Sequence, residues 1–520
     1  MQRTLSANRS TQLFLAALAL GYSADLLFYG KSLGISLLLF VLLFVGALIY
    51  LGRTAGVPFT RNNRWLLLPL LFFAGMVAIR ANPFLTALNV LAVLALLSYL
   101  LVYYAAGHLK EMGLATTLIL PLYTLGKSLI SAGPVVAENV NEHAGRWQSR
   151  VSLLPFIRGG LLAFPVLLVF TILLASADLV FGDRIESFFT LDFIAEMVRL
   201  TWRLFLILMV SWLVAGGLAM ALDRKHPAET LGHHLAKLHR PFALGFVEST
   251  IILVLISLLF LAFVAFQFHY LFGGEANVNL AGYTYAEYAR RGFFELVTVA
   301  VMSLGLILGL DWLTWRESKQ QLRLFKLLSS LMIALVLLML ASAFQRMRLY
   351  EAAYGYTELR LYVIVFIIWL AVLLIWFVLT LWRWPDRFAI GMFLVAAGYL
   401  ATLNLLNPDA FIVRQNLARY QASGDLDAAY LVRLSADAVP GLYRSLAEVQ
   451  GDGQPVISPS CNPYWAAENE EECMTTLSGI LFEDLLDRYS DMQSDSDWRR
   501  WQSFHLSRQR AYQLLLAGMG

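Results

Sequence analysis

The sequence predicts an all-α fold, a polytopic transmembrane helical bundle of about 11 spans with a C-terminal helical extracytoplasmic domain. Of 520 residues, 59% are apolar and 14% are charged, and the mean hydropathy is +0.65, which is typical of a chain solvated mainly by lipid. A polar segment, residues 407–520, follows the last apolar stretch and holds both cysteines but no lysine. We therefore expect two domains, a transmembrane domain over 1–406 and a separate C-terminal domain over 407–520, here called the tail.

The predicted spans are the apolar stretches long enough, or nearly so, to cross a hydrocarbon layer of about 30 Å as helices. They are expected near 12–29, 33–51, 65–81, 84–106, 159–180, 198–222, 243–270, 293–313, 326–344, 361–382 and 388–405. The first could pass for a signal peptide, but it lacks a convincing small-residue cleavage site and is expected to be retained. A further apolar stretch, Leu114–Ile130, is short and carries Pro121 and Lys127, so we expect a re-entrant or interfacial helix.

The orientation follows from the basic residues, because lysine and arginine in short loops resist translocation. With the N-terminus in the cytoplasm, the inner loops hold 20 basic residues and the outer loops hold eight. The tail has nine arginines and 16 acidic residues, a net charge of −7, and it lies outside if the number of crossings is odd. An extra crossing at 114–130 would bring it inside. The sequence thus predicts a multi-pass protein of the bacterial inner membrane with its N-terminus in and its C-terminus out.

The tail is expected to contain short helices and one disulfide bond. Helix starts are indicated at Asn407–Pro408, Asp425 and Pro440, and two longer helices at Met474–Leu485 and Trp498–Leu515. An oxidising compartment would join Cys461 to Cys473, although two unpaired thiols remain an alternative. No metal site and no cofactor are expected, because neither a second cysteine pair nor suitably spaced histidines accompany them. The negative charge also argues against nucleic acid as a partner.

Tyrosines, arginines and acidic residues gather in two predicted outer loops and in the first tail helix. This predicted rim consists of Tyr283, Tyr285, Glu287, Tyr288, Arg290, Arg291, Glu295, Arg346, Arg348, Glu351, Tyr354, Arg360, Arg414 and Arg419. One interpretation is an aromatic belt at the lipid headgroups, with paired charges that dock the tail. The other is a pocket in which arginines bind a carboxylate or phosphate and tyrosines stack on a sugar or an acyl chain.

Several sequence motifs of this chain resemble those of an uncharacterised family of bacterial polytopic membrane proteins, which is defined only as a domain of unknown function. The resemblance is carried by YLFGG at 270–274, YTYAEYARRGFFEL at 283–296, RMRLYEAAYGYTELRLY at 346–362 and the tail phrase NPDAFIVRQNLARY at 407–420. It implies the same multi-helix fold and the same closing segment. It brings no activity and no catalytic residues.

Two classes of function remain open from the sequence. The first is a non-enzymatic envelope protein that binds a lipid, an envelope ligand or a protein partner at its outer face. The second is a membrane enzyme similar to a lipid-linked glycosyltransferase, which would need an outer-loop acid such as Asp183, Glu186 or Asp192. A transporter is less favoured, because the few charges in the spans lie near helix ends rather than at the midplane.

Overall fold

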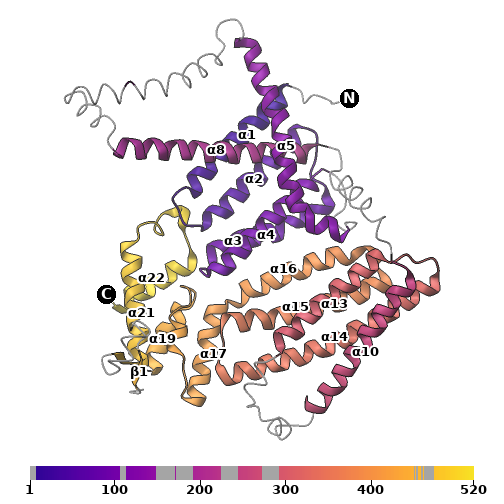
Figure 1. Ribbon diagram of the computed structural model, residues 1–520. Coiled ribbons are helices and arrows are strands. Elements are labelled where there is room, and N and C mark those ends of the chain that lie inside the picture. The colour runs from indigo at the N-terminus through magenta and orange to yellow at the C-terminus, as the bar shows by residue number, and fades with distance from the viewer. Residues whose placement is uncertain are drawn as a thin grey trace.

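A computed structural model describes residues 7–105, 113–147, 170, 191–223, 244–271, 292–449, 451, 455–457, 461 and 473–519. Within these residues it is almost entirely helical, which confirms the predicted fold class (Figure 1). Eleven of the described helices are long and apolar enough to cross a membrane. The predicted span at 159–180 lies outside the described residues, except for Phe170.

The membrane helices form two bundles joined by the last of them. The first bundle consists of α1 (Ala7–Phe28), α2 (Ile35–Thr54), the 3-10 turn η1 (Arg61–Leu66) with α3 (Leu67–Ile79), α4 (Pro83–Val102), α5 (Leu114–Trp147) and α8 (Leu191–Leu222). The second consists of α10 (Phe246–Leu271), α13 (Phe293–Leu313), α14 (Lys319–Tyr354), α15 (Glu358–Arg383), the 3-10 turn η4 (Pro385–Arg387) and α16 (Phe388–Leu406). Because α16 places Leu400 and Leu403 in the first core and Phe388 in the second, it connects the two.

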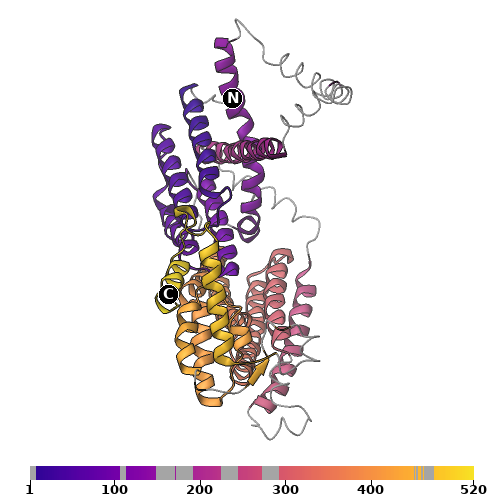
Figure 2. The ribbon, with the colours of Figure 1, turned by 90° about the vertical axis from the view of Figure 1, so that its left-hand side faces the viewer.

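The tail is a small helical unit with its own core. It contains α17 (Pro408–Ser423), α18 (Ala428–Leu431), α19 (Val439–Val449), α21 (Leu477–Ser494), η6 (Trp501–Ser503) and α22 (Leu506–Met519). Buried Ile412, Leu442 and Leu481 are among the residues of its core. Figure 2 looks onto this unit, with α21 in front of the bundle.

Two details of the tail differ from the prediction. Strands β1 (Pro455–Ile457) and β2 (Met474–Thr476) form a small antiparallel sheet where only helices and a loop were expected. The last helix begins at Leu506, whereas Trp498 and Trp501 lie before it in turns. A strand of three residues is too short to show the alternation of apolar and polar side chains from which a strand is predicted.

The tail packs onto one face of the bundles, called the tail face. Three turns of the bundles form hydrogen bonds with the tail on this face. The donors are the backbone amides of Ile35 at the α1–α2 turn, Ala81 at the α3–α4 turn and Tyr356 at the α14–α15 turn. On the opposite face, Thr60 N donates to the carbonyl of Tyr104, and Leu244 forms a bridge with Thr314. The start of α1 and the tail therefore lie on opposite faces.

Helix α5 is apolar enough to span a membrane over Leu114–Ala137, where the sequence predicts an interfacial or re-entrant helix over 114–130. Near its start, Tyr99 in the last turn of α4 donates to the Thr117 carbonyl, and further along Ser10 in the first turn of α1 donates to the Val135 carbonyl. Both neighbours belong to helix ends on the opposite face. Figure 1 accordingly shows α5 running steeply across α8.

Candidate functional site at the junction of tail and bundle

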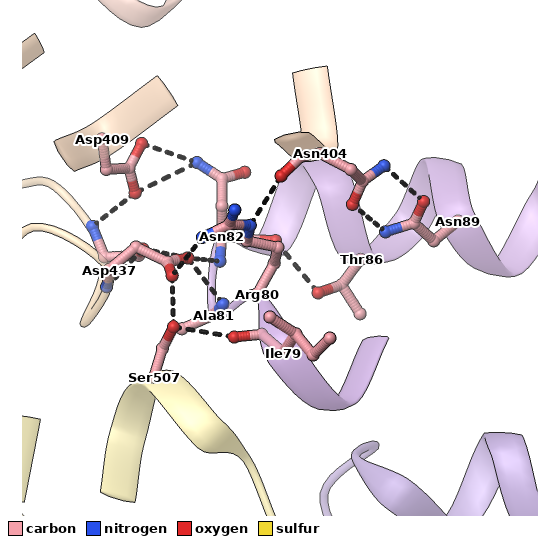
Figure 3. A network of polar contacts seen from close by, with 11 residues as sticks. Ile79, Arg80, Ala81, Asn82, Thr86, Asn89, Asn404, Asp409, Asp437 and Ser507 are labelled. Carbon is pink, nitrogen blue, oxygen red and sulfur yellow. Dashed lines mark hydrogen bonds and ion pairs between the residues drawn. The ribbon is translucent and has the colours of Figure 1, made fainter. Parts of the chain in front are cut away.

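The N-terminus of α4 is held by a carboxylate from the tail. Asp437 Oδ2 accepts hydrogen bonds from the backbone amides of Ala81 (2.7 Å) and Asn82 (3.2 Å). Such amides have no partner within their own helix, and a negative charge there is favoured by the helix dipole. Ser507 of α22 hydrogen-bonds the other oxygen of Asp437 and lies 2.7 Å from the Ile79 carbonyl oxygen. The tail thereby completes the cap of a bundle helix (Figure 3).

Asn82 joins one acid of the bundle to one acid of the tail. Its Oδ1 caps α4 by accepting from Leu85 N at 3.0 Å. Its Nδ2 donates to Glu358 Oε1 at 2.5 Å and to Asp409 Oδ1 at 3.0 Å. The amide thus lies between two carboxylates that would otherwise repel each other.

Asp409 is completely buried at the start of α17. Its second oxygen accepts from the backbone amide of Ser435 at 3.0 Å. Burial raises the pKa of Asp409, and the charge of Glu358 raises it further. Burial likewise raises the pKa of Asp437, while its hydrogen bond from Ser507 lowers it in part. The docked arrangement therefore binds protons on these acids more readily than an open arrangement in water would.

Arg80 extends the site toward the membrane interior. Its Nε donates to the Asn404 carbonyl at 2.7 Å, and Nη1 lies 3.7 Å from Asp437 Oδ1. The side chains of Asn404 and Asn89 exchange two hydrogen bonds of 2.8 and 2.9 Å, and both residues are completely buried (Figure 3). We call Arg80, Asn82, Glu358, Asp409, Asp437 and Ser507 the junction network.

The α14–α15 turn is a second contact with the tail. Asn416 accepts from Tyr356 N at 2.7 Å and donates to the Tyr356 carbonyl at 2.9 Å. The turn contains Gly355 at φ 77° and ψ 177°, a region open essentially to glycine alone. A Cβ on Gly355 would lie 2.7 Å from Asn416 Oδ1, so the close approach also requires a glycine.

Two arginines of the predicted rim cap the C-terminus of α14. Arg360 donates to the carbonyls of Tyr354 (3.1 Å) and Gly355 (2.5 Å), and its guanidinium lies 4.2 Å from the centre of the Tyr350 ring. Arg419 of α17 donates to the carbonyls of Ala352 and Ala353, from the other side of the turn. Cations favour the carbonyl end of a helix, so these arginines serve docking and capping in this structure.

The other rim residues are more dispersed. Glu295, Arg348, Tyr354 and Arg414 are exposed, and Arg346 is half-buried with its guanidinium beside Gly292. Arg414 lies over the Phe411 ring. Glu351 is buried, and neither carboxylate oxygen has a hydrogen-bond partner. The remaining rim residues, Tyr283, Tyr285, Glu287, Tyr288, Arg290 and Arg291, lie outside the described residues.

A third contact joins the α1–α2 turn to the segment around η6. Phe504 accepts from Ile35 N at 3.1 Å, and Asp497 accepts from Ser32 N at 3.0 Å. A Cβ on Gly34 would lie 2.5 Å from the Phe504 carbonyl oxygen. The tail is therefore held at three separate turns, which fixes its orientation on the bundles.

The two cysteines of the tail form a disulfide bond, as expected. The Cα atoms of Cys461 and Cys473 are 5.8 Å apart. Cys473 directly precedes β2, so the bond lies beside the small sheet. Within the part of the chain that the structure describes, no group of three or more His, Cys, Asp or Glu could hold a metal ion.

Comparison with known proteins gives one match. A family model described as "Domain of unknown function (DUF4153)" matches residues 67–445, which include the bundles from α3 onward, α17, α18 and part of α19. No curated protein and no solved structure matches the chain. Of the junction network, all members except Ser507 fall within the matched range.

Proposed function

Because the chain belongs to the DUF4153 family, whose description names no activity, we propose from the geometry of the junction that it is a non-enzymatic envelope protein. Its helices anchor the tail in one fixed orientation at the extracytoplasmic face, and the tail with its adjoining turns binds a ligand or protein partner there. One observation carries the proposal. The junction network links three tail segments to two bundle turns through buried, mutually satisfied polar groups.

The network supports docking rather than catalysis because its polar atoms are already engaged. Asp437 and Asp409 accept hydrogen bonds from backbone amides, and Asn82 uses its amide group on two carboxylates. Breaking one member of a buried network leaves the others unpaired, at a cost of about 1–3 kcal/mol for each group. Such an arrangement favours a single orientation of the tail over a hinged one.

The placement of the chain ends supports the proposed orientation. The start of α1 lies on the face opposite the tail, and Arg203 of α8 is bound at 2.6 Å to Asp25 near the other end of α1. Both placements agree with an odd number of crossings and with the excess of basic residues that the sequence predicts for the inner loops. The tail face would then be the extracytoplasmic one, in an inner membrane of a bacterium.

The enzyme alternative rests on Asp183, Glu186 and Asp192. The first two lie outside the described residues, and Asp192 is in the first turn of α8. The role as an enzyme therefore stays a hypothesis, and so does a role as a transporter.

The orientation is tested with single added cysteines in intact cells. Ser494→Cys, on an exposed position of α21, should react with a membrane-impermeant maleimide, whereas Arg61→Cys on the opposite face should react only after the membrane is opened. The reverse pattern would refute the proposed orientation.

Partner binding is tested by photo-crosslinking from the outer surface of the tail. Phe482 and Leu486 are 45% and 39% exposed on α21, and a photoreactive residue at either position should give discrete adducts in cells. The matched control is Leu258, an exposed apolar position on α10 that faces the lipid if α10 spans the membrane. Adducts from neither tail position, or the same adducts from Leu258, would contradict a binding role for the tail.

A further inference from the structure

Glu351 lies in α14 beyond the part of the helix that can sit in hydrocarbon. The stretch Leu327–Gln345 holds no charged residue and is 19 residues long, or about 29 Å at 1.5 Å per residue. This length matches the hydrocarbon layer of about 30 Å. Glu351 comes six residues later, roughly 9 Å further along the helix axis, on the tail face. It therefore belongs to the junction with the tail.

The carboxylate of Glu351 is enclosed without a donor. The residue is 1% exposed, and neither Oε1 nor Oε2 has a hydrogen-bond partner. One turn before it lies Met347, which forms a small buried apolar cluster with Phe293 and Ile364. Buried acids in proteins are usually paired or hydrogen-bonded, so a lone one calls for an explanation.

The neighbouring charged groups act on Glu351 without contacting it. Arg348 on the same helix and Arg360 on α15 are its cationic neighbours, but neither donates a hydrogen bond to the carboxylate of Glu351. Arg360 is held by carbonyls and by Tyr350 instead. Tyr356 follows in the turn, and burial together with the Glu351 charge raises the pKa of that tyrosine.

The other charged side chains on the helices around Glu351 are bound to other groups or exposed. Arg419 of α17 is bound to carbonyls and to Asp425, and Glu295 of α13 is exposed. Arg346 on α14 lies beside Gly292. Among the residues that the structure describes, none donates a hydrogen bond to the carboxylate of Glu351.

We propose that Glu351 is a proton-binding site that couples docking of the tail to the acidity at the tail face. With a proton bound, the neutral acid fits its apolar enclosure. When the proton leaves to water, the remaining carboxylate requires water or a direct partner such as Arg348, and the last turn of α14 must open to supply one. The inference rests on the proposed anchoring of the tail.

Opening there would act directly on the tail contacts. The next two residues, Ala352 and Ala353, offer the carbonyls that Arg419 binds. Gly355 and Tyr356 then approach Asn416. Movement of this single turn therefore breaks the contacts that Asn416 and Arg419 of α17 make with it, so an alkaline exterior loosens the tail and an acidic one holds it.

The test is hydrogen exchange of the α17 peptide in the full-length protein in lipid nanodiscs, corrected for the intrinsic pH dependence of exchange. The raised pKa values of known buried carboxylic acids fall between about pH 5.5 and about pH 8.5. When the pH is raised over this range, the wild-type peptide should lose protection from exchange by roughly tenfold or more. Glu351→Gln, a neutral residue of the same shape, should stay protected at both values. Glu295→Gln, an exposed acid on α13, should keep the wild-type pH response.

Several outcomes would overturn the proposal. They are a wild-type peptide with no pH response, a Glu351→Gln variant with the full wild-type response, and a Glu351→Gln variant that is unprotected at both values. Glu351→Met provides a second neutral variant and should also be protected at high pH. Because exchange is measured on purified protein, it separates this inference from the proposed function, which is decided by labelling and crosslinking in cells.

Discussion

Asn82 offers the sharpest test of the docking argument because it contributes to both the bundle and the tail. Asn82→Ala removes the cap of α4, which costs about 1 kcal/mol, and takes the donor from Asp409 and Glu358, at about 1.5 kcal/mol each. Only the bond to Asp409 joins the bundle to the tail, so docking of the tail should lose about 1.5 kcal/mol. This corresponds to a rise of roughly tenfold in the undocked population, since 1.4 kcal/mol is a factor of ten.

The assay is native-state hydrogen exchange of the peptide covering α17, which reports the free energy of local opening. Ser98→Ala is the matched control, since Ser98 lies on the same helix and donates only to the Leu94 carbonyl. It should change the opening free energy of α17 by less than about 0.5 kcal/mol. An Asn82→Ala variant with equally unchanged exchange would refute the view that the junction network holds the tail.

Three further predictions concern the tail and its junctions. Gly355→Ala should destabilise docking by about 2–3 kcal/mol, as measured by exchange of α17, whereas Gly424→Ala should cost only about 1 kcal/mol because open space surrounds that glycine; equal effects would contradict the steric account. Asn407, at φ 54° between α16 and α17, should tolerate Gly within about 0.5 kcal/mol but lose about 1 kcal/mol on change to Ala, in thermal unfolding of the purified protein. Burial lowers the pKa of His505 to about 4, so only the unfolded chain gains a proton as the pH falls from 6.5, and the free energy of unfolding should drop by about 3 kcal/mol by pH 4; His505→Gln should remove this part of the pH dependence, and an identical pH profile would show that His505 is not enclosed.

The membrane helices could be predicted because a long run of apolar residues is enough to identify each of them. A run of about 20 apolar residues has few stable alternatives in lipid, and the predicted 293–313 coincides with α13. Helix α14 extends well beyond the predicted 326–344 in both directions, because capping by Ser318 and contacts with the tail prolong it past the apolar stretch. Hydropathy thus locates the spans but not the parts of helices outside lipid.

The junction network was not predictable for a different reason. Its contacts join residues that are hundreds of positions apart, such as Asn82 with Asp409 at a separation of 327. The one local signal was Asn82 before Pro83, a helix-start pattern that explains the cap but not the two carboxylates. Arg360 and Arg419 did belong to the predicted rim, yet their partners are backbone carbonyls, which no side-chain pattern reveals.

The amide pair of Asn89 and Asn404 has a consequence for how the protein is made. The two residues are 315 positions apart, and at 5–20 residues per second the ribosome needs about 15–60 s to reach the second after the first. During that time α4 is already synthesised while its amide partner does not yet exist. An unpaired amide in lipid is costly and seeks other donors and acceptors. The first bundle can therefore complete this pair only after α16 has been synthesised, late in translation.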